Sequence, residues 1–302
     1  LDISPSQGPS RGGTVVTVRG SGFVSNDPTI SQLYKCSFGL NIVRAIMINS
    51  THIRCTVPSI SSSDLSVTVK VSTNGVQFTD ENMLFVYYNS IQLTNIAPKA
   101  GPESGGTAIT VHGSGFLDST HLHCLFNSNV RVHATFINSQ KISCISPPAT
   151  TTTKRFGVTI TVSNNGADIS AAGALQYLYH GRPTVSSISP AYGLCNQVNS
   201  TTVLTVHGSG FTNTEELSCR VGNVQAVKTQ FLSSTVLFCT IQFLQAGSHQ
   251  VLVSNNKVDY STSIIASNDA DDKDETQFLS IPSFSIVSMY PTNGSLTGGT
   301  DI

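Results

Sequence analysis

Seven cysteines are the residues of this 302-residue chain whose types and spacing most clearly predict chemistry. Six of them form three pairs with separations of 19, 20 and 20 positions: Cys36 and Cys55, Cys124 and Cys144, and Cys219 and Cys239. Nearly constant spacing predicts three local disulfide bonds, each stabilising the fold by very roughly 3 kcal/mol. Zinc is the alternative, but two cysteines without regular histidine partners do not complete a four-ligand site. Disulfides imply an oxidising compartment, so we expect an extracellular or cell-surface location.

Cys195 is the seventh cysteine and belongs to no such pair. It lies in the polar stretch "GLCNQVNS", residues 193–200. Three interpretations stay open: a free thiol, a bond to another part of a longer protein, and a bond that joins two chains.

Carboxylates gather in "NDADDKDE", residues 268–275. Carboxylate oxygens are preferred calcium ligands, so the calcium candidates are Asp269, Asp271, Asp272, Asp274 and Glu275. The stretch lacks the EF-hand spacing and has Lys273 at the fifth position of the loop. A solvated run of charge is therefore the expected interpretation, and the sequence predicts no metal site and no cofactor.

A glycine-rich stretch, "RGGTVVTVRGSGF" at residues 11–23, has the composition of a phosphate-binding loop. No Lys-Ser or Lys-Thr pair follows its glycines, as a P-loop would require. The ending Gly-Ser-Gly-Phe is also not the Gly-x-Ser-x-Gly turn of a serine hydrolase, because phenylalanine takes the last position. We find no candidate catalytic residue and expect no enzyme activity.

The same stretch recurs as "SGGTAITVHGSGF" at 104–116, "NSTTVLTVHGSGF" at 199–211 and a partial "TGGTDI" at 297–302. The shared threonines lie 93, 95 and 98 positions apart, which is a domain-sized period. The predicted domains are residues 1–90, 91–182, 183–284 with the acidic loop inserted, and 285–302 as the start of a fourth unit. We expect the chain to be a segment of a longer protein.

Period-two patterns in each unit predict β-strands. The alternating apolar residues are Val16 and Val18, Ile109 and Val111, and Leu204 and Val206. The two glycines that follow are expected to bend the strand through backbone angles that other residues resist, and so to turn the next phenylalanine into the core. Asn-Gly hairpin signals, closing aromatic strands and the lack of an amphipathic helix favour tandem all-β sandwiches.

Composition excludes several classes of function. Charged residues make up 11%, the net charge is −1, and no apolar run is long enough to cross a membrane. Without a basic stripe, nucleic-acid binding is not expected. Three sequons, at Asn49, Asn199 and Asn293, are compatible with a secreted glycoprotein.

The ordered set of motifs resembles the IPT/TIG domain: Ile-x-Pro-x-x-Gly, Gly-Gly-Thr, an alternating strand, Gly-Ser-Gly-Phe and a cysteine pair about twenty positions apart. That resemblance implies immunoglobulin-like sandwiches of the extracellular kind found in plexins, fibrocystin-like proteins and amoebal adhesion receptors. The expected function is a structural or adhesive repeat array. The alternative is a spacer and partial binding surface of a signalling receptor. The expected partners are proteins, homotypic or heterotypic, including further repeats of the same longer chain.

Overall fold

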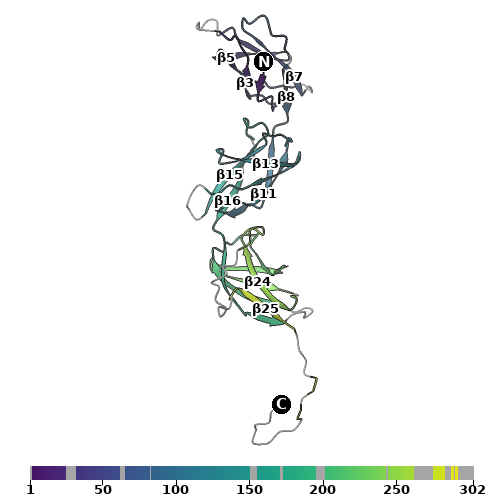
Figure 1. The fold of residues 1–302 in the computed structure, drawn as a ribbon, viewed down its shortest axis with the longest axis vertical. Coiled ribbons are helices and arrows are strands. Elements are labelled where there is room, and N and C mark those ends of the chain that lie inside the picture. Colours follow the sequence, from purple (N-terminus) through teal and green to yellow (C-terminus); the bar gives the residue numbers. More distant parts are fainter. Residues whose placement is uncertain are drawn as a thin grey trace. The chain divides into compact units, whose positions relative to one another are not determined.

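The computed structural model describes residues 2–24, 32–61, 65–81, 83–149, 155–170, 173–194, 201–242, 244–261, 275–282, 287–288 and 290–291. Strands, turns and loops account for all of these residues, and none of them is helical (Figure 1). The chain divides into two compact units, Leu1–His180 and Gly181–Ile302. The first unit holds two repeats, formed by β1–β8 and β9–β16, and the second unit holds the third repeat, β17–β25.

The first repeat forms one continuous set of eight strands in the order β1-β3-β6-β5-β4-β7-β8-β2. Their bounds are β1 Asp2–Ser4, β2 Gln7–Pro9, β3 Val15–Arg19, β4 Lys35–Phe38, β5 Asn41–Asn49, β6 His52–Thr56, β7 Ser66–Ser72 and β8 Met83–Tyr88. Neighbours are antiparallel except β2 and β8, which are parallel.

The second repeat has the same arrangement, in the order β9-β11-β14-β13-β12-β15-β16-β10. Its strands are β9 Gln92–Ala97, β10 Ala100–Pro102, β11 Ala108–Ser114, β12 His123–Phe126, β13 Val130–Asn138, β14 Lys141–Ile145, β15 Arg155–Ser163 and β16 Leu175–His180. The single parallel pair is again the short lead-in strand with the closing strand, β10 with β16.

A single long strand joins the two faces of each sandwich in the first unit. The first part of β5, Asn41 to Arg44, pairs with β4, and the part from Ala45 onward pairs with β6. The strand β13 makes the same change of partner at Ala134. One strand that serves both sheets closes one side of the sandwich without exposing an edge.

In the third repeat this strand is interrupted, so its two sheets are separate, β17-β19-β23-β22 and β18-β25-β24-β20-β21. The bounds are β17 Thr184–Ser189, β18 Tyr192–Leu194, β19 Thr202–Ser209, β20 Ser218–Val221, β21 Val224–Gln225, β22 Lys228–Ser233, β23 Val236–Ile241, β24 Gly247–Ser254 and β25 Gln277–Ile281. The predicted all-β fold is thus confirmed in both units.

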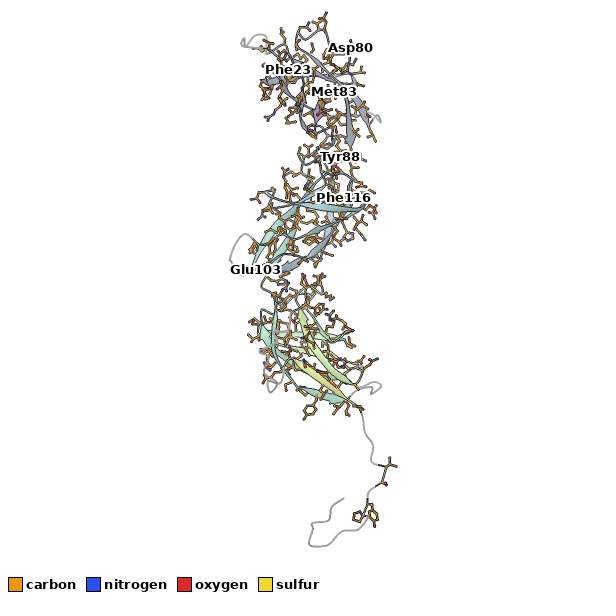
Figure 2. The ribbon with its side chains drawn as sticks, in the orientation of Figure 1. Phe23, Asp80, Met83, Tyr88, Glu103 and Phe116 are labelled. Carbon is orange, nitrogen blue, oxygen red and sulfur yellow. A yellow bond between two sulfur atoms is a disulfide. The ribbon has the colours of Figure 1, made fainter. Side chains whose placement is uncertain are left out.

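Each repeat has its own core, built from the predicted alternating positions. The six apolar residues Val16, Val18, Ile109, Val111, Leu204 and Val206 are all 0% exposed. The phenylalanines that follow the two glycines, Phe23, Phe116 and Phe211, are also buried. Figure 2 labels the first two of them. The predicted closing strands are β8, β16 and β25, and each contributes an aromatic side chain to its core.

The prediction for the two glycines is right for the second and wrong for the first. The second glycine has a positive φ in every repeat, 78° at Gly22, 81° at Gly115 and 73° at Gly210. The first does not, but a Cβ at Gly113 would collide with the carbonyl oxygen of Gln92 on the neighbouring strand. In the second and third repeats, close approach of the adjacent backbone, rather than an unusual backbone angle, therefore requires the first glycine, Gly113 or Gly208.

The Asn-Gly signals lie in antiparallel hairpins, but not in two-residue turns. Strands β7 and β8 pair antiparallel, and the chain between them runs from residue 73 to 82. The side chain of Asn74 shapes this longer loop, because its Oδ1 accepts hydrogen bonds from the amides of Val76 and Gln77 at 3.0 and 2.9 Å. An asparagine that bonds the backbone two and three residues ahead stabilises a loop in place of a tight turn.

Candidate functional site

The three cysteine pairs are bonded in the structure as Cys36–Cys55, Cys124–Cys144 and Cys219–Cys239. Each bond joins a strand on one face of its sandwich to a strand on the other face. The bonded strands are β4 and β6, β12 and β14, and β20 and β23. All six cysteines are buried within the apolar cores. The bonds are structural cross-links between sheets, and they are not accessible redox centres.

The contact between the first and second repeats centres on the loop after β15. There, Asn165 Oδ1 accepts the amides of Ala167 and Asp168 at 3.0 and 2.8 Å, which fixes the loop. The same side chain donates from Nδ2 to the Asp168 carboxylate at 2.7 Å and to the Gln7 carbonyl of the first repeat at 2.8 Å. Asn165 therefore holds Asp168 and contacts the first repeat at the same time.

Asp168 reaches a fully buried residue of the first repeat. The hydroxyl of Thr14, 0% exposed, donates to Asp168 Oδ2 at 2.8 Å. Thr14 is the threonine of the first Gly-Gly-Thr motif, and it packs against Gly8 so closely that a Cβ there would collide with its hydroxyl. Hydrogen bonds to a charged acceptor contribute more than neutral ones, so this contact stabilises the relation between the two repeats.

Tyr88, at the end of β8, lies against the same contact (Figure 2). Burial and, secondly, the Asp168 carboxylate raise the pKa of its phenol, while the Arg11 guanidinium acts in the opposite sense. Side chains of both repeats leave a cavity of only about 10 Å³ around these groups. Because that is room for one water at most, the two repeats pack closely here.

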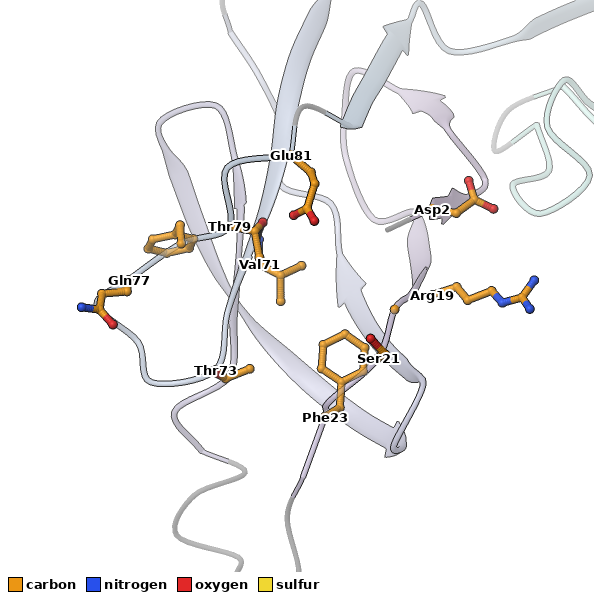
Figure 3. Close-up of a pocket in the computed structure, with 11 residues that line it drawn as sticks. Asp2, Arg19, Ser21, Phe23, Val71, Thr73, Gln77, Thr79 and Glu81 are labelled. Carbon is orange, nitrogen blue, oxygen red and sulfur yellow. Dashed lines mark hydrogen bonds between the residues drawn. The ribbon is translucent and has the colours of Figure 1, made fainter.

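A hollow of the first repeat lies at the opposite end of its strands (Figure 3). It measures about 730 Å³ and runs between Gly20, Ser21 and Phe23 on one side and Val71, Thr73, Gln77, Phe78, Thr79 and Glu81 on the other, with Asp2 and Arg19 at its end. The lining includes two acids, Asp2 and Glu81, and one base, Arg19, and none of the described residues that line it is a histidine or a cysteine.

The outer face of β5 carries an exposed apolar stripe. Ile42, Ile46 and Ile48 are 59%, 63% and 47% exposed, and the exposed Arg44 lies between Ile42 and Ile46 on the same face. The alternate positions of the strand, Val43, Ala45 and Met47, pack on the core. In the second repeat the first two stripe positions are polar, Arg131 and Thr135, and only Ile137 keeps an exposed apolar side chain. Three exposed isoleucines on one strand face are a feature of the first repeat that its core does not require.

The remaining sequence-predicted site residues are only partly described. Asn49 is exposed, and its Oδ1 accepts the amide and the hydroxyl of Thr51, both at 2.9 Å. Glu275 is exposed, and its backbone carbonyl accepts the amide of Ile188 at 3.1 Å. Cys195, Asn199, Asn293 and the calcium candidates Asp269, Asp271, Asp272 and Asp274 lie outside the described residues.

The described part of the chain contains no group of three or more His, Cys, Asp or Glu side chains placed to hold a metal ion. Within those same residues, no helix has the length and apolar character needed to span a membrane.

Sequence reasoning missed the Asp168 contact, although a signal was present. Asparagine is followed three residues later by aspartate in "NGAD", residues 165–168, and in "NKVD", residues 256–259, whereas the first repeat has "NGVQ". In the third repeat Asn256 Nδ2 donates to Asp259 at 2.7 Å, and its Oδ1 accepts the Asp259 amide at 2.8 Å, which reproduces the geometry of the second repeat. The motif thus predicts a fixed carboxylate at the tip of this loop.

The fold and the buried disulfides define a chain of tandem immunoglobulin-like β-sandwiches of the extracellular type. The sequence profile of the IPT/TIG domain matches residues 1–87, 92–177 and 183–268. These matches cover well over half of the sequence, and the chain belongs to the IPT/TIG domain family. Its location is extracellular or at the cell surface. The disulfide bonds support this location, and so does the similarity to fibrocystin-L and plexin-A3.

Two human proteins are among the relatives. Fibrocystin-L of Homo sapiens is 27% identical over 307 residues, covering 100% of this chain and 7% of fibrocystin-L. Plexin-A3 of Homo sapiens is 25% identical over 247 residues, covering 78% of this chain and 13% of plexin-A3. The full extracellular region of plexin A4 aligns structurally over 95% of this chain and 24% of that chain, with 19% identity and a TM-score of 0.45. The chain therefore spans a small fraction of these relatives.

Proposed function

We propose that this chain is a non-catalytic extracellular segment in which the first two domains are fixed to one another and the domains present side chains to other proteins. The observation that carries the proposal is the bond from Thr14 to Asp168. A flexible spacer has no need for a carboxylate that reaches a fully buried hydroxyl of the preceding domain. Neighbouring domains are expected to move relative to one another unless their interface restrains them. A hydrogen bond from a buried hydroxyl to a carboxylate supplies such a restraint between the first two repeats, which supports a structural element.

The partner surface that we propose is the apolar stripe of β5, made of Ile42, Ile46 and Ile48. Apolar side chains in contact with water favour association with another protein surface. The partner is a protein, either a second copy of this chain or a different one. A structural or adhesive array uses such a face for contacts between molecules.

Sedimentation velocity of the purified chain tests the adhesive form of this proposal. We expect concentration-dependent self-association that the double variant Ile42→Arg and Ile46→Thr abolishes. These replacements are the residues that the second repeat has at the matching positions of β13, so the same place in the fold accommodates them there. Val76→Thr, at an apolar residue that is 80% exposed outside β5, is the control. A wild type that stays monomeric at all concentrations would rule out homotypic adhesion through this face.

The second candidate is the ectodomain spacer and partial binding surface of a signalling receptor. Similarity to plexin-A3 over 78% of this chain favours it. The full-length parent sequence separates the two candidates. A membrane-spanning helix followed by a kinase or GTPase-activating domain supports the receptor, whereas a long series of further repeats supports the structural array.

A further inference from the structure

The outer face of the second repeat carries two histidines on neighbouring strands. His123 is the first residue of β12, His133 lies on β13, and the two residues pair directly in the antiparallel ladder. Directly paired residues project from the same face of a sheet. The next pair along the ladder, Cys124 and Val132, faces the core. Both imidazoles therefore lie on the face away from the core, with His123 half-buried and His133 exposed.

The distance between the two rings suits a single shared metal ion. Their centroids lie 5.7 Å apart, and their planes meet at 76°. First-row divalent cations bind imidazole nitrogen at about 2.0–2.1 Å, so two rings that share one ion have centroids about 5–6 Å apart at ordinary bond angles. The strand register thus already provides the spacing that such an ion requires.

His123 is held in the protonation state that a metal ligand needs. Its Nδ1 lies 2.7 Å from the backbone carbonyl oxygen of His121. Because a carbonyl only accepts, Nδ1 carries the proton, and Nε2 of the neutral ring keeps its lone pair. Metal-binding histidines are commonly oriented by this kind of hydrogen bond from the other ring nitrogen. Among the described residues, none forms a hydrogen bond with Nε2 of His123 or with a ring nitrogen of His133.

The groups beside the pair leave its nitrogens available. Arg131 lies two positions before His133 on the same face of β13, and its guanidinium donates to the Gly166 carbonyl at 2.8 Å. On the other side of β12, the residue paired with His123 is the uncharged Ser163 of β15. A cation already bonded elsewhere and a neutral hydroxyl do not occupy the two imidazoles.

The fold itself does not require histidine at these positions. In the first repeat the matching residues are Lys35 and Arg44, paired in the same register between β4 and β5. In the third repeat the residue before the first paired cysteine is Ser218. Lysine and arginine are protonated at neutral pH and have no lone pair for a metal ion. The two-histidine arrangement is therefore a feature of the second repeat alone.

We propose that His123 and His133 form a binding site for a first-row divalent transition-metal cation. The ligands are Nε2 of His123 and one ring nitrogen of His133, and water completes the coordination. Imidazole suits zinc, copper and nickel ions, whereas calcium and magnesium prefer oxygen ligands. The bound ion cross-links β12 to β13, the strand that serves both faces of the sandwich. Because the folded chain brings the two ligands together, binding stabilises the native state.

Calorimetric titration of the full chain with zinc ions at about pH 7.5, where an ordinary imidazole is neutral, tests the site. All forms carry Cys195→Ser, since a thiolate would also bind zinc. The variants His123→Lys and His133→Arg introduce the residues of the first repeat at the matching positions. His112→Gln, on β11 of the same repeat, is the control. Unfolding midpoints measured with EDTA establish that every variant is folded.

We expect each of the two variants to weaken zinc binding by at least about tenfold, because a single histidine remains, and the control to bind as the parent does. Zinc should raise the unfolding midpoint of the first unit in the parent and in the control only. Unchanged zinc affinity in both variants would overturn the proposal. It would also fail if each variant lost half of the bound zinc at unchanged affinity, because the two histidines would then bind separate ions.

A second measurement needs no substitution at the site. Diethyl pyrocarbonate modifies imidazole nitrogens that are not bound, and mass spectrometry locates the modified histidines. Zinc should protect His123 and His133 of the parent chain and leave His112 reactive. Equal reactivity of all three with and without zinc would contradict the site.

Discussion

Asp168 of the second repeat accepts a hydrogen bond from Thr14, a residue that is fully buried in the first repeat and lies 154 positions earlier in the chain. Asn165 holds the carboxylate in this position through a 2.7 Å hydrogen bond. The threonine that opens the alternating strand of one domain is thus also the docking point for the next. Thr14 therefore contributes both to the packing of its own repeat and to the contact with the second repeat.

Replacing Asp168 with Ala should weaken the coupling of the first two repeats. The Thr14 hydroxyl would remain buried without its acceptor, which costs about 1–3 kcal/mol. Differential scanning calorimetry should show a lower unfolding midpoint for the first unit, and hydrogen exchange should rise at residues 7–14. Asp118→Ala removes an exposed carboxylate of the same repeat and is the matched control. Indistinguishable behaviour of the two variants would mean that the contact contributes nothing to coupling.

Alkaline pH should destabilise the first unit through Tyr88. Burial and the Asp168 carboxylate raise the pKa of this phenol above the ordinary value of 10.0, so the folded state favours its neutral form. The associated stability is complete below pH 10 and is lost as the pH rises through the folded-state pKa. Tyr88→Phe keeps the ring but cannot ionise, so its unfolding midpoint should fall less than that of the wild type between pH 9 and 11. Parallel curves for the two proteins would contradict the assignment.

The alternating pattern of Val16 and Val18 and the position of Phe23 were predictable from the sequence, because a half-buried strand imposes a period of two on its own residues. The role of Asp168 was not, since its partner lies in another domain and no local pattern links the two.

The requirement for the first glycine was misjudged for a related reason. Gly113 has an ordinary backbone angle, and it must be glycine because the Gln92 carbonyl lies against it. Sequence composition indicates that a small residue is needed at such a position. It does not distinguish a strained backbone from a close neighbour, because both exclude a side chain.

The disulfide pattern should be found by non-reducing peptide mapping of the secreted chain. We expect the bonds Cys36–Cys55, Cys124–Cys144 and Cys219–Cys239, with Cys195 in none of them. Replacing both Cys124 and Cys144 with Ser should cost about 2–5 kcal/mol, since the bond joins the two sheets of the second repeat. Cys195→Ser is the control and should leave all three bonded peptides unchanged. Free thiols at the six paired positions, or bonds between repeats, would contradict both the pairing and the oxidising compartment.

Valine substitutions at two equivalent glycines should separate backbone strain from steric collision. Gly115 and Gly22 have nearly the same φ, 81° and 78°, so valine suffers the same conformational strain of roughly 1–3 kcal/mol at both. At Gly115 the new side chain would also press on the carbonyls of Asn89 and Ser90, 3.0 and 3.2 Å from its Cβ, whereas at Gly22 the Cβ meets open space. Gly115→Val should therefore lower the stability of its repeat more than Gly22→Val does, as measured by chemical denaturation. Equal losses would show that strain alone sets the cost at both positions.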